Sequence, residues 1–194
     1  MFSQNDEEAV IKKFFGEAKG RFLDLGAYDG RSLSNTHALA LRGWSGVAVE
    51  ASPLAHLALR ETYKGRSDIE CVCAAVTADL DGSIMLWESA DALSTTVSAN
   101  YEVWKKSAKF NEVRVPAVSL KTFLEAHPGP YDFVSVDTEG TSAELALLMP
   151  WAELGTRLVC VEHDGRYGDL TRTLGAIGFS VLSYNGENVL LGRL

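Results

Sequence analysis

The sequence is short of basic residues and of cysteine. Its 194 residues include 18 lysines and arginines against 26 aspartates and glutamates, which gives a formal net charge of −8. Proteins that bind duplex nucleic acid need a basic surface to displace counterions from the phosphates, so we expect no nucleic-acid partner. The three cysteines are an odd number. Cys71 and Cys73 alternate along a predicted strand and share one face, where burial as small apolar side chains is a better interpretation than a metal or redox pair.

Long apolar runs and a targeting signal are also missing. No apolar run approaches the roughly 20 residues that cross a bilayer. The N-terminal stretch MFSQNDEEAVIKKFF has acids where a secretory signal has a basic head. We therefore expect a cytoplasmic protein that does not contact a membrane, and reduced thiols fit that compartment.

The composition that remains is that of one soluble domain. Hydrophobic residues make up 46% and charged residues 23% of the chain, as in ordinary globular proteins. A length of 194 residues suits one domain with a sizeable core better than two. We predict a single domain over residues 1–194, without internal repeats.

Helix-like and strand-like segments alternate along the chain. Apolar residues recur at helical spacing from about residue 5 to residue 18, and Pro53 suits the first turn of a later helix. Strands are expected at 21–25, 45–50, 69–76, 130–137, 156–164, 179–184 and 188–194, and further helices at 32–42, 53–63, 119–127, 138–151 and 168–177. The alternation predicts an α/β fold with five parallel strands, crossover helices on both faces and a C-terminal antiparallel hairpin.

Residues 81–116 do not follow this alternation. Their pattern suggests an inserted hairpin or edge strands with a mobile linker. An aromatic and basic segment inside this insertion could act as an acceptor-binding lid, or it could be an amphipathic helix with a solvated basic face. The residues concerned are Tyr101, Trp104, Lys105, Lys106 and Lys109.

Polar residues stand where four of the predicted strands end. They are Asp24, Glu50, Asp137 and the neighbours Glu162 and His163. In open α/β sheets, ligands bind at the carboxyl ends of the strands where the strand order reverses. We therefore expect the functional site at this edge of the sheet.

A glycine-punctuated turn, Gly26-Ala27-Tyr28-Asp29-Gly30, follows the first predicted strand. Such a turn lets the backbone approach a ligand closely. Dinucleotide enzymes show a further glycine that admits the pyrophosphate, in the pattern Gly-x-Gly-x-x-Gly, and this turn lacks it. An adenosyl ligand without phosphates fits better, with Glu50 accepting hydrogen bonds from both ribose hydroxyls.

Four segments, taken in order, resemble the FkbM family of S-adenosylmethionine-dependent methyltransferases. They are FLDLGAYDGRSLSNT, LRGWSGVAVEASP, VPAVSLKTFLEAH and YDFVSVDTEGTSAELA, and the resemblance covers roughly residues 20–165. The most specific mark is the strand that ends in Asp-x-Glu-Gly after a V-x-L-x-x-F-L segment. The resemblance implies a Rossmann-like class I methyltransferase sandwich with a mostly parallel seven-stranded sheet. It also implies S-adenosylmethionine as cofactor and, typically, O-methylation of a sugar or small natural product.

The resemblance assigns roles to the turn after the first strand. Asp24 and Gly26 would shape the loop around the methionine part of the donor, and Gly30 would allow close approach at the helix start. Tyr28 and Thr138 depart from the family pattern. Tyr28 could change how the loop closes over the methionine tail.

The resemblance also assigns the rest of the donor site. Glu50 would hold the ribose, with Ala51 and Ser52 beside the adenine. Asp137 would face the amino group of the donor or the acceptor. The remaining candidate cofactor-binding residues are Ala27, Tyr28, Asn35, Thr36, Ala74 and Ala75.

Methyl transfer to a hydroxyl needs alignment of the acceptor with the sulfonium and a base for the proton. His163 is the favoured base, because an imidazole titrates near neutral pH and the residue follows a strand end. Asp137 or Glu139 is the competing base, or the group that orients His163. A divalent metal such as Mg²⁺, held by Asp137, Glu139 and Asp164, is an alternative, although their spacing is no recognised metal signature.

Two other classes of function share the expected fold. A nicotinamide-dependent oxidoreductase or epimerase would need the pyrophosphate glycine and a Tyr-x-x-x-Lys pair, whereas Tyr101 and Lys105 lie in the irregular middle of the chain. A non-catalytic adenosyl-binding module would tolerate substitution of His163 or Asp137. Charged residues at several strand ends argue against such a module, since their burial without a ligand costs free energy. The identity of the small hydroxylated acceptor and the oligomeric state stay open.

Overall fold

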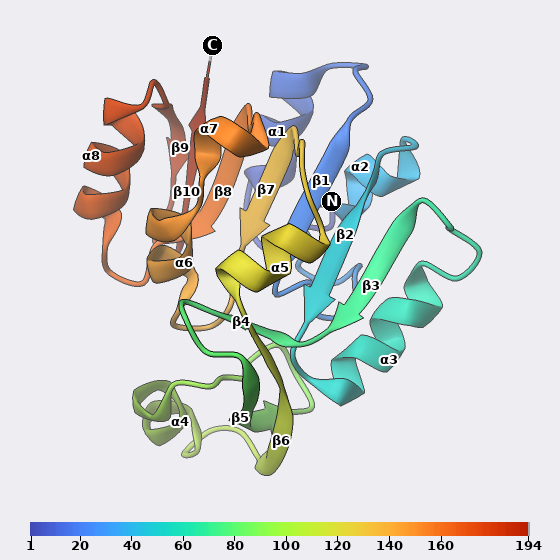
Figure 1. Cartoon of the computed structure of the whole chain (residues 1–194), viewed down its shortest axis with the longest axis vertical. Helices are drawn as coiled ribbons and strands as arrows, with labels where there is room; N and C mark the ends of the chain where they lie inside the picture. The colour runs from blue at the N-terminus through green and yellow to red at the C-terminus, as the bar shows by residue number, and fades with distance from the viewer. Residues whose placement is uncertain (194) are drawn as a thin grey trace.

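The computed structural model describes residues 1–193 and shows helices on both faces of a seven-stranded sheet (Figure 1). The strands follow the spatial order β3-β2-β1-β7-β8-β10-β9. Their bounds are β1 Arg21–Leu25, β2 Ser45–Glu50, β3 Ile69–Cys73, β7 Phe133–Val136, β8 Leu158–Glu162, β9 Ser180–Tyr184 and β10 Asn188–Gly192. The predicted α/β Rossmann-like fold is confirmed, and Leu194, the last residue of the predicted final strand, lies outside the described residues.

The strand order reverses at β1. This strand pairs in parallel with β2 on one side and with β7 on the other, and β3 and β8 continue the parallel pairing outward. β10 runs antiparallel to both β8 and β9, so the C-terminal pair forms the expected hairpin. Because ligands bind such sheets where the order reverses, the carboxyl ends of β1 and β7 mark the place to look for a site.

Two hydrophobic cores lie on opposite faces of the sheet. The helices α1 Glu7–Phe15, α2 His37–Leu41 and α3 Pro53–Thr62 cover one face, and α5 Leu120–Ala126, α6 Ser142–Leu148, α7 Trp151–Leu154 and α8 Tyr167–Ala176 cover the other. Successive strand residues point to opposite faces. Phe22 accordingly packs with Trp44 in the first core and Leu23 packs with Val134 in the second.

A second, three-stranded sheet lies beyond the carboxyl ends of the large sheet (Figure 1). It has the order β4-β6-β5, with β4 Ala75–Thr77, β5 Gly82–Ser89 and β6 Phe110–Ser119. β5 and β6 form an antiparallel hairpin, as predicted for the insertion, and the helix α4 Ser98–Trp104 stands between them in the chain. Trp87 stacks on Tyr101 with ring centroids 5.0 Å apart, so an aromatic contact ties α4 to β5.

Two predicted elements differ from the structure. The expected strand 69–76 divides at Ala74, and its two parts join different sheets as β3 and β4. Hydrophobic pattern does not reveal this division, because both parts are half-buried strands. The helix expected over 32–42 is reduced to α2 His37–Leu41. Before it, Leu33 takes a φ of 57°, a left-handed conformation that interrupts a helix.

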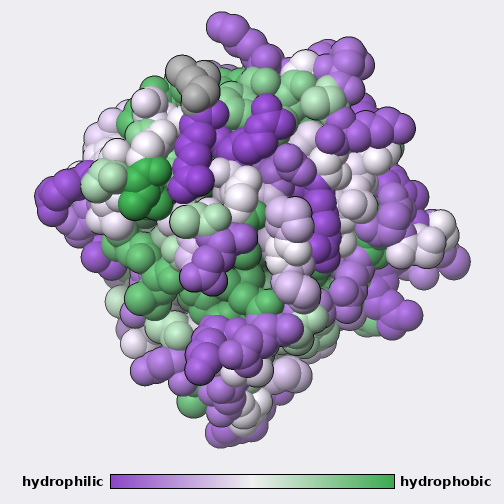
Figure 2. All heavy atoms as spheres, turned by 45° about the horizontal axis from the view of Figure 1, so that its top comes forward, coloured by the Kyte–Doolittle hydropathy of each residue, from purple (hydrophilic) through white to green (hydrophobic). Residues whose placement is uncertain are grey.

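Polar residues cover much of the molecular surface in Figure 2, with hydrophobic residues gathered over the middle and left of that view. Within residues 1–193 no helix is both long and apolar enough to span a bilayer.

Candidate functional site

A cleft opens at the carboxyl ends of β1, β2 and β7. Its empty volume, including the open mouth, is about 970 Å³. The ends of these strands supply one side, and the insertion supplies the other with Asp91, Ala92, Ser94 and Thr96. The cleft therefore lies at the reversal of strand order, where the sequence predicted a ligand.

The turn after β1 is packed tightly against the end of β7. The amides of Gly26 and Ala27 both donate hydrogen bonds of 2.9 Å to the carbonyl oxygen of Val49, and the amide of Asp137 donates to that of Leu25 at 2.8 Å. Gly26 has a φ of 87°, and a Cβ there would overlap the carbonyl oxygen of Asp137. Glycine is thus required at residue 26 by both backbone conformation and space.

Glu50 stands at the end of β2 with its carboxylate turned into the cleft. The residue is 8% exposed, and burial raises its pKa to about 7. Its Oε2 accepts a 2.9 Å hydrogen bond from the amide of Tyr28, and its Oε1 accepts one of 2.7 Å from the amide of Ser52. Each oxygen keeps a further lone pair, so the carboxylate can accept the two hydroxyls of a ribose while its position is fixed by the backbone.

Asp24 and Asn35 form the floor of the cleft beside this turn. Burial raises the pKa of Asp24 to about 6, and Thr36 Oγ1 donates a 2.6 Å hydrogen bond to Asp24 Oδ2. Asn35 donates through Nδ2 to Ser135 Oγ at 3.2 Å, while its buried Oδ1 has no hydrogen-bond partner within the described chain. An orphaned buried acceptor next to a carboxyl suits the ammonium group of a methionine-like ligand. The residues present therefore fit S-adenosylmethionine.

The loop after β7 carries two further carboxyl groups into the cleft, those of Asp137 and Glu139. Burial, followed by repulsion from Glu139 and Asp24, raises the pKa of Asp137 to about 7. Burial, followed by repulsion from Glu162 and other acids, raises the pKa of Glu139 to about 8. Glu139 has a φ of 55°, which is uncommon for a residue with a side chain and is typical of functional loops.

A hydrogen-bonded chain supports this loop from behind. The amide of Thr138 donates to Ser142 Oγ at 2.8 Å, and Ser142 Oγ donates in turn to Glu162 Oε2 at 2.9 Å. Burial and the neighbouring charge of Asp137 raise the pKa of Glu162 to about 8. Glu162 does not line the cleft, so it acts on the site through Asp137 and the loop.

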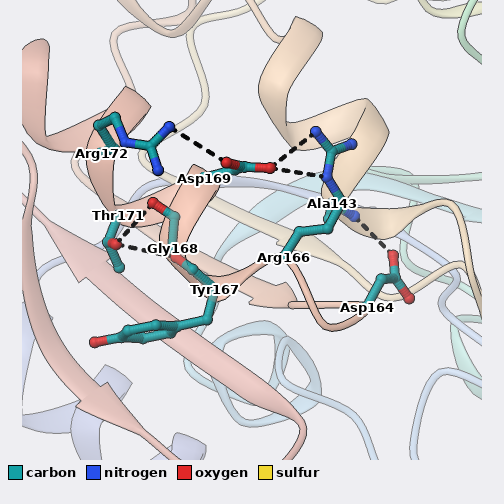
Figure 3. A network of polar contacts seen from close by, with 8 residues as sticks. All are labelled: Ala143, Asp164, Arg166, Tyr167, Gly168, Asp169, Thr171 and Arg172. Carbon is teal, nitrogen blue, oxygen red and sulfur yellow. Dashed lines mark hydrogen bonds and ion pairs between the residues drawn. The ribbon is translucent and has the colours of Figure 1, made fainter.

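Asp164, the third candidate metal ligand, does not line the cleft. Its Oδ2 accepts a 2.9 Å hydrogen bond from the amide of Ala143 in the first turn of α6, while Arg166 and Arg172 extend to Asp169 (Figure 3). Over residues 1–193, no three His, Cys, Asp or Glu side chains converge as metal ligands. The arrangement does not fit the Mg²⁺ site considered for Asp137, Glu139 and Asp164.

His163 is likewise not brought into the cleft, which corrects its choice as the base. Its Nδ1 accepts a 3.0 Å hydrogen bond from the amide of Gly165, and its Nε2 lies 3.1 Å from the carbonyl oxygen of Gly186. The ring packs near Tyr184. Backbone groups occupy both nitrogens, one in the loop after β8 and the other in the β9–β10 turn. The position of His163 directly after a strand did not place it in the cleft, because its strand, β8, lies one strand further from the reversal point than β7.

Most of the residues predicted to bind the cofactor line the cleft. They are Asp24, Gly26, Ala27, Tyr28, Asn35, Glu50, Ala51, Ala74, Ala75 and Asp137. Three others, Thr36, Ser52 and Gly30, do not line the cleft. Thr36 donates a hydrogen bond to Asp24, and Ser52 accepts one from the Ala55 amide as the N-cap of α3. Gly30 is needed for packing, since a Cβ there would lie 2.6 Å from Leu59.

The lid residues predicted in the insertion pack within it instead of lining the cleft. Tyr101 lies between Trp87 and Phe110, and Lys105 forms an ion pair with Glu102. The insertion contributes to the cleft through the segment before α4, whose residues were not among those predicted for the site. The hydroxyl-rich run STTVS was the available signal, because threonine and serine donors suit a polar ligand.

Comparisons with known proteins agree with this geometry. The model of the methyltransferase FkbM domain matches residues 24–170. No curated protein matches the chain. Among solved structures, the ribosomal protein L11 methylase of Lactobacillus delbrueckii subsp. bulgaricus is similar, with a TM-score of 0.51 and 13% identity over 97% of this chain and 77% of that one. The METTL16 methyltransferase domain gives a TM-score of 0.54 and 13% identity over 96% of this chain and 65% of that one.

A third similar structure is the human methyltransferase 10 domain containing protein, with a TM-score of 0.50 and 13% identity over 95% of this chain and 76% of that one. These low identities establish the class I methyltransferase fold and no more. The family match is more specific, because it spans the turn after β1, Glu50 and the loop after β7. The chain belongs to the FkbM methyltransferase domain family, for which S-adenosylmethionine is the implied methyl donor.

Proposed function

We propose that the protein transfers a methyl group from S-adenosylmethionine to a hydroxyl oxygen of a small acceptor, either a sugar or a natural product. The observation that supports the donor is the cleft at the β1–β7 reversal. There the fixed carboxylate of Glu50 and the unpartnered Oδ1 of Asn35 stand at the two ends expected for the ribose and the amino group.

The acceptor side of the proposal rests on enclosure by the insertion. Asp91, Ser94 and Thr96 face the loop after β7 across the cleft, so the space next to Asp137 is bounded on both sides. An enclosed space suits a small molecule better than a polymer strand. Oxygen is the proposed target because the nearby groups are carboxyls, which can take a hydroxyl proton as attack proceeds.

Asp137 is the base in this proposal, with Glu139 as the neighbouring carboxyl. The donor supplies an electrophilic methyl group when bound. The acceptor oxygen forms the new bond to that carbon as the carbon–sulfur bond breaks, and the Asp137 carboxylate receives the hydroxyl proton. Ser142 holds Glu162 at 2.9 Å, and the hydrogen bond between Glu162 and Asp137 lowers the pKa of Asp137, while burial and the charges of Glu139 and Asp24 raise it to about 7. A raised pKa near neutrality is what a general base needs.

Calorimetric titration with S-adenosylmethionine, S-adenosylhomocysteine and NAD tests the donor. We expect both adenosyl ligands to bind and NAD not to bind. Glu50→Gln should weaken their binding about 10- to 100-fold, since a hydrogen bond to a charged group contributes about 1.5–3 kcal/mol. Glu125→Gln, an exposed carboxyl on α5, is the matched control and should bind normally. Binding of NAD in preference to the adenosyl ligands would favour the oxidoreductase interpretation instead.

Methyl transfer itself is tested with labelled S-adenosylmethionine and a panel of hydroxylated sugars. Product formation that depends on Asp137 supports catalysis. Adenosyl binding without transfer to any hydroxyl acceptor would favour the non-catalytic module.

A further inference from the structure

All the charged side chains that line the cleft within residues 1–193 are acidic. Five carboxyl side chains line it, those of Asp24, Glu50, Asp91, Asp137 and Glu139, and the lining residues in the described chain include no lysine, arginine or histidine. An anionic ligand such as a phosphorylated sugar would meet only repulsion in this space. The ligands of the cleft must therefore bring positive charge or hydrogen-bond donors with them.

The five carboxyls differ in how well the protein itself satisfies them. Asp24 and Glu50 accept hydrogen bonds from Thr36, Tyr28 and Ser52. By contrast, Asp137 shares a hydrogen bond with the Glu162 carboxyl, and within residues 1–193 no N–H or O–H group donates to the carboxyl of Glu139. The Glu139 carboxyl is half-buried and lines the cleft, and together with the buried Asn35 Oδ1, which has no hydrogen-bond partner within the described chain, it indicates a ligand that donates hydrogen bonds.

The charged groups that act most strongly on Glu139 are acids. The charges that raise its pKa, after burial, come from Glu162, Asp164, Glu187 and Asp91. The lysines of the insertion do not compensate, since they are absent from the lining and Lys105 pairs with Glu102. A cation placed next to Glu139 would relieve this repulsion.

The donor accounts for one end of the cleft only. S-Adenosylmethionine carries a net positive charge, and its ammonium group fits the Asp24 and Asn35 floor beside the turn after β1. Asp91, on the insertion, and Glu139, on the loop after β7, line the cleft and are not part of that floor. Their charge is therefore left for the acceptor.

We propose that the acceptor carries a protonated amine next to the hydroxyl that is methylated, as in an amino sugar, and that Glu139 and Asp91 bind the ammonium group. This inference rests on the proposed methyltransferase function. Asp137 then remains the base for the hydroxyl proton, while the ammonium group orients the acceptor oxygen toward the donor. The same charges disfavour phosphorylated acceptors.

The inference is tested by measuring the binding of three matched sugars to the protein saturated with S-adenosylhomocysteine. Glucosamine carries the ammonium group, N-acetylglucosamine keeps the nitrogen without the charge, and glucose lacks the nitrogen. We expect glucosamine to bind at least about tenfold more tightly than either neutral sugar at neutral pH, because a charge-assisted hydrogen bond contributes about 1.5–3 kcal/mol. Glu139→Gln should remove this preference, whereas Glu112→Gln on the exposed side of β6 should keep it.

The outcomes separate this inference from the proposed function. Failure of S-adenosylhomocysteine to bind overturns the proposed function. Normal binding of S-adenosylhomocysteine without any preference for glucosamine, including no sugar binding at all, overturns only the inference. Mg²⁺ added alone is a further probe, and its binding in a manner that depends on Glu139 would show that a metal ion, not an amine, supplies the positive charge.

Discussion

Thr95 Oγ1 donates a 2.7 Å hydrogen bond to the backbone carbonyl oxygen of Glu139. Asn100 Nδ2 donates to the same oxygen at 2.9 Å. Thr95 is also tied to β5, because its amide and carbonyl groups exchange hydrogen bonds with those of Trp87. These hydrogen bonds join the insertion to the loop that carries Glu139. They hold Glu139 at its left-handed φ of 55°.

Removing the Thr95 hydroxyl should loosen this loop. Thr95 is 1% exposed, so Thr95→Val leaves a buried carbonyl with one donor fewer and should lower the free energy of unfolding by about 1–3 kcal/mol. Thr95→Ser keeps the hydroxyl and should recover most of the loss. Urea denaturation measures the unfolding free energy of both variants. Equal stability of the Thr95→Val and wild-type proteins would show that the hydrogen bond is unimportant.

Gly26→Ala should disrupt the donor site. The substitution places a Cβ onto the carbonyl oxygen of Asp137 and forces a side chain to a φ of 87°. We expect loss of S-adenosylhomocysteine binding and a lower melting temperature. Gly168→Ala on α8 is the control, since nothing lies within 4 Å of its added methyl group and alanine favours helix. Similar behaviour of the two variants would contradict the argument from space.

The unliganded protein should become more stable as the pH falls from about 8 to about 5. Burial raises the pKa of Glu50 to about 7 and that of Glu139 to about 8, above the values near 4.5 of exposed glutamates. In this range the folded state therefore binds more protons than the unfolded state, so unfolding free energy increases as protons are added. Melting temperatures across the range check the sign, and Glu139→Gln should flatten the slope.

Glu7 should be important for stability although it does not line the cleft. It is fully buried, and its Oε1 accepts hydrogen bonds from Nδ2 of Asn185 at 2.7 Å and of Asn188 at 3.0 Å. Burial raises its pKa, but the hydrogen bonds outweigh burial and lower the pKa overall. Glu7→Ala leaves these donors without an acceptor and should lower the free energy of unfolding by about 2–4 kcal/mol. Thermal unfolding of Glu7→Ala and of Glu8→Ala compares the two neighbouring acids directly.

His163 and Asp137 should respond differently to substitution. His163→Gln should keep methyl transfer within about twofold of wild type, because the imidazole faces the β9–β10 turn. Asp137→Asn removes the proposed base and should reduce kcat about 10²- to 10⁴-fold. Rates measured at saturating donor distinguish the two. A large loss in the His163 variant with unchanged stability would restore it as the base.

The sequence alone determined the layered α/β fold, the parallel strands and most of the residues that line the cleft at the ends of β1 and β2. Local patterns suffice for these features, since Asp24, Gly26 and Glu50 stand beside strand ends that burial and turn residues reveal. Tertiary structure decided which residues face the insertion across the cleft. Whether His163 or Asp137 enters the cleft depends on which strand adjoins β1, and the contact of Thr95 with Glu139 joins residues 44 positions apart in the chain. The pairing order of strands and the docking of an insertion are non-local, so no short stretch of sequence encodes them.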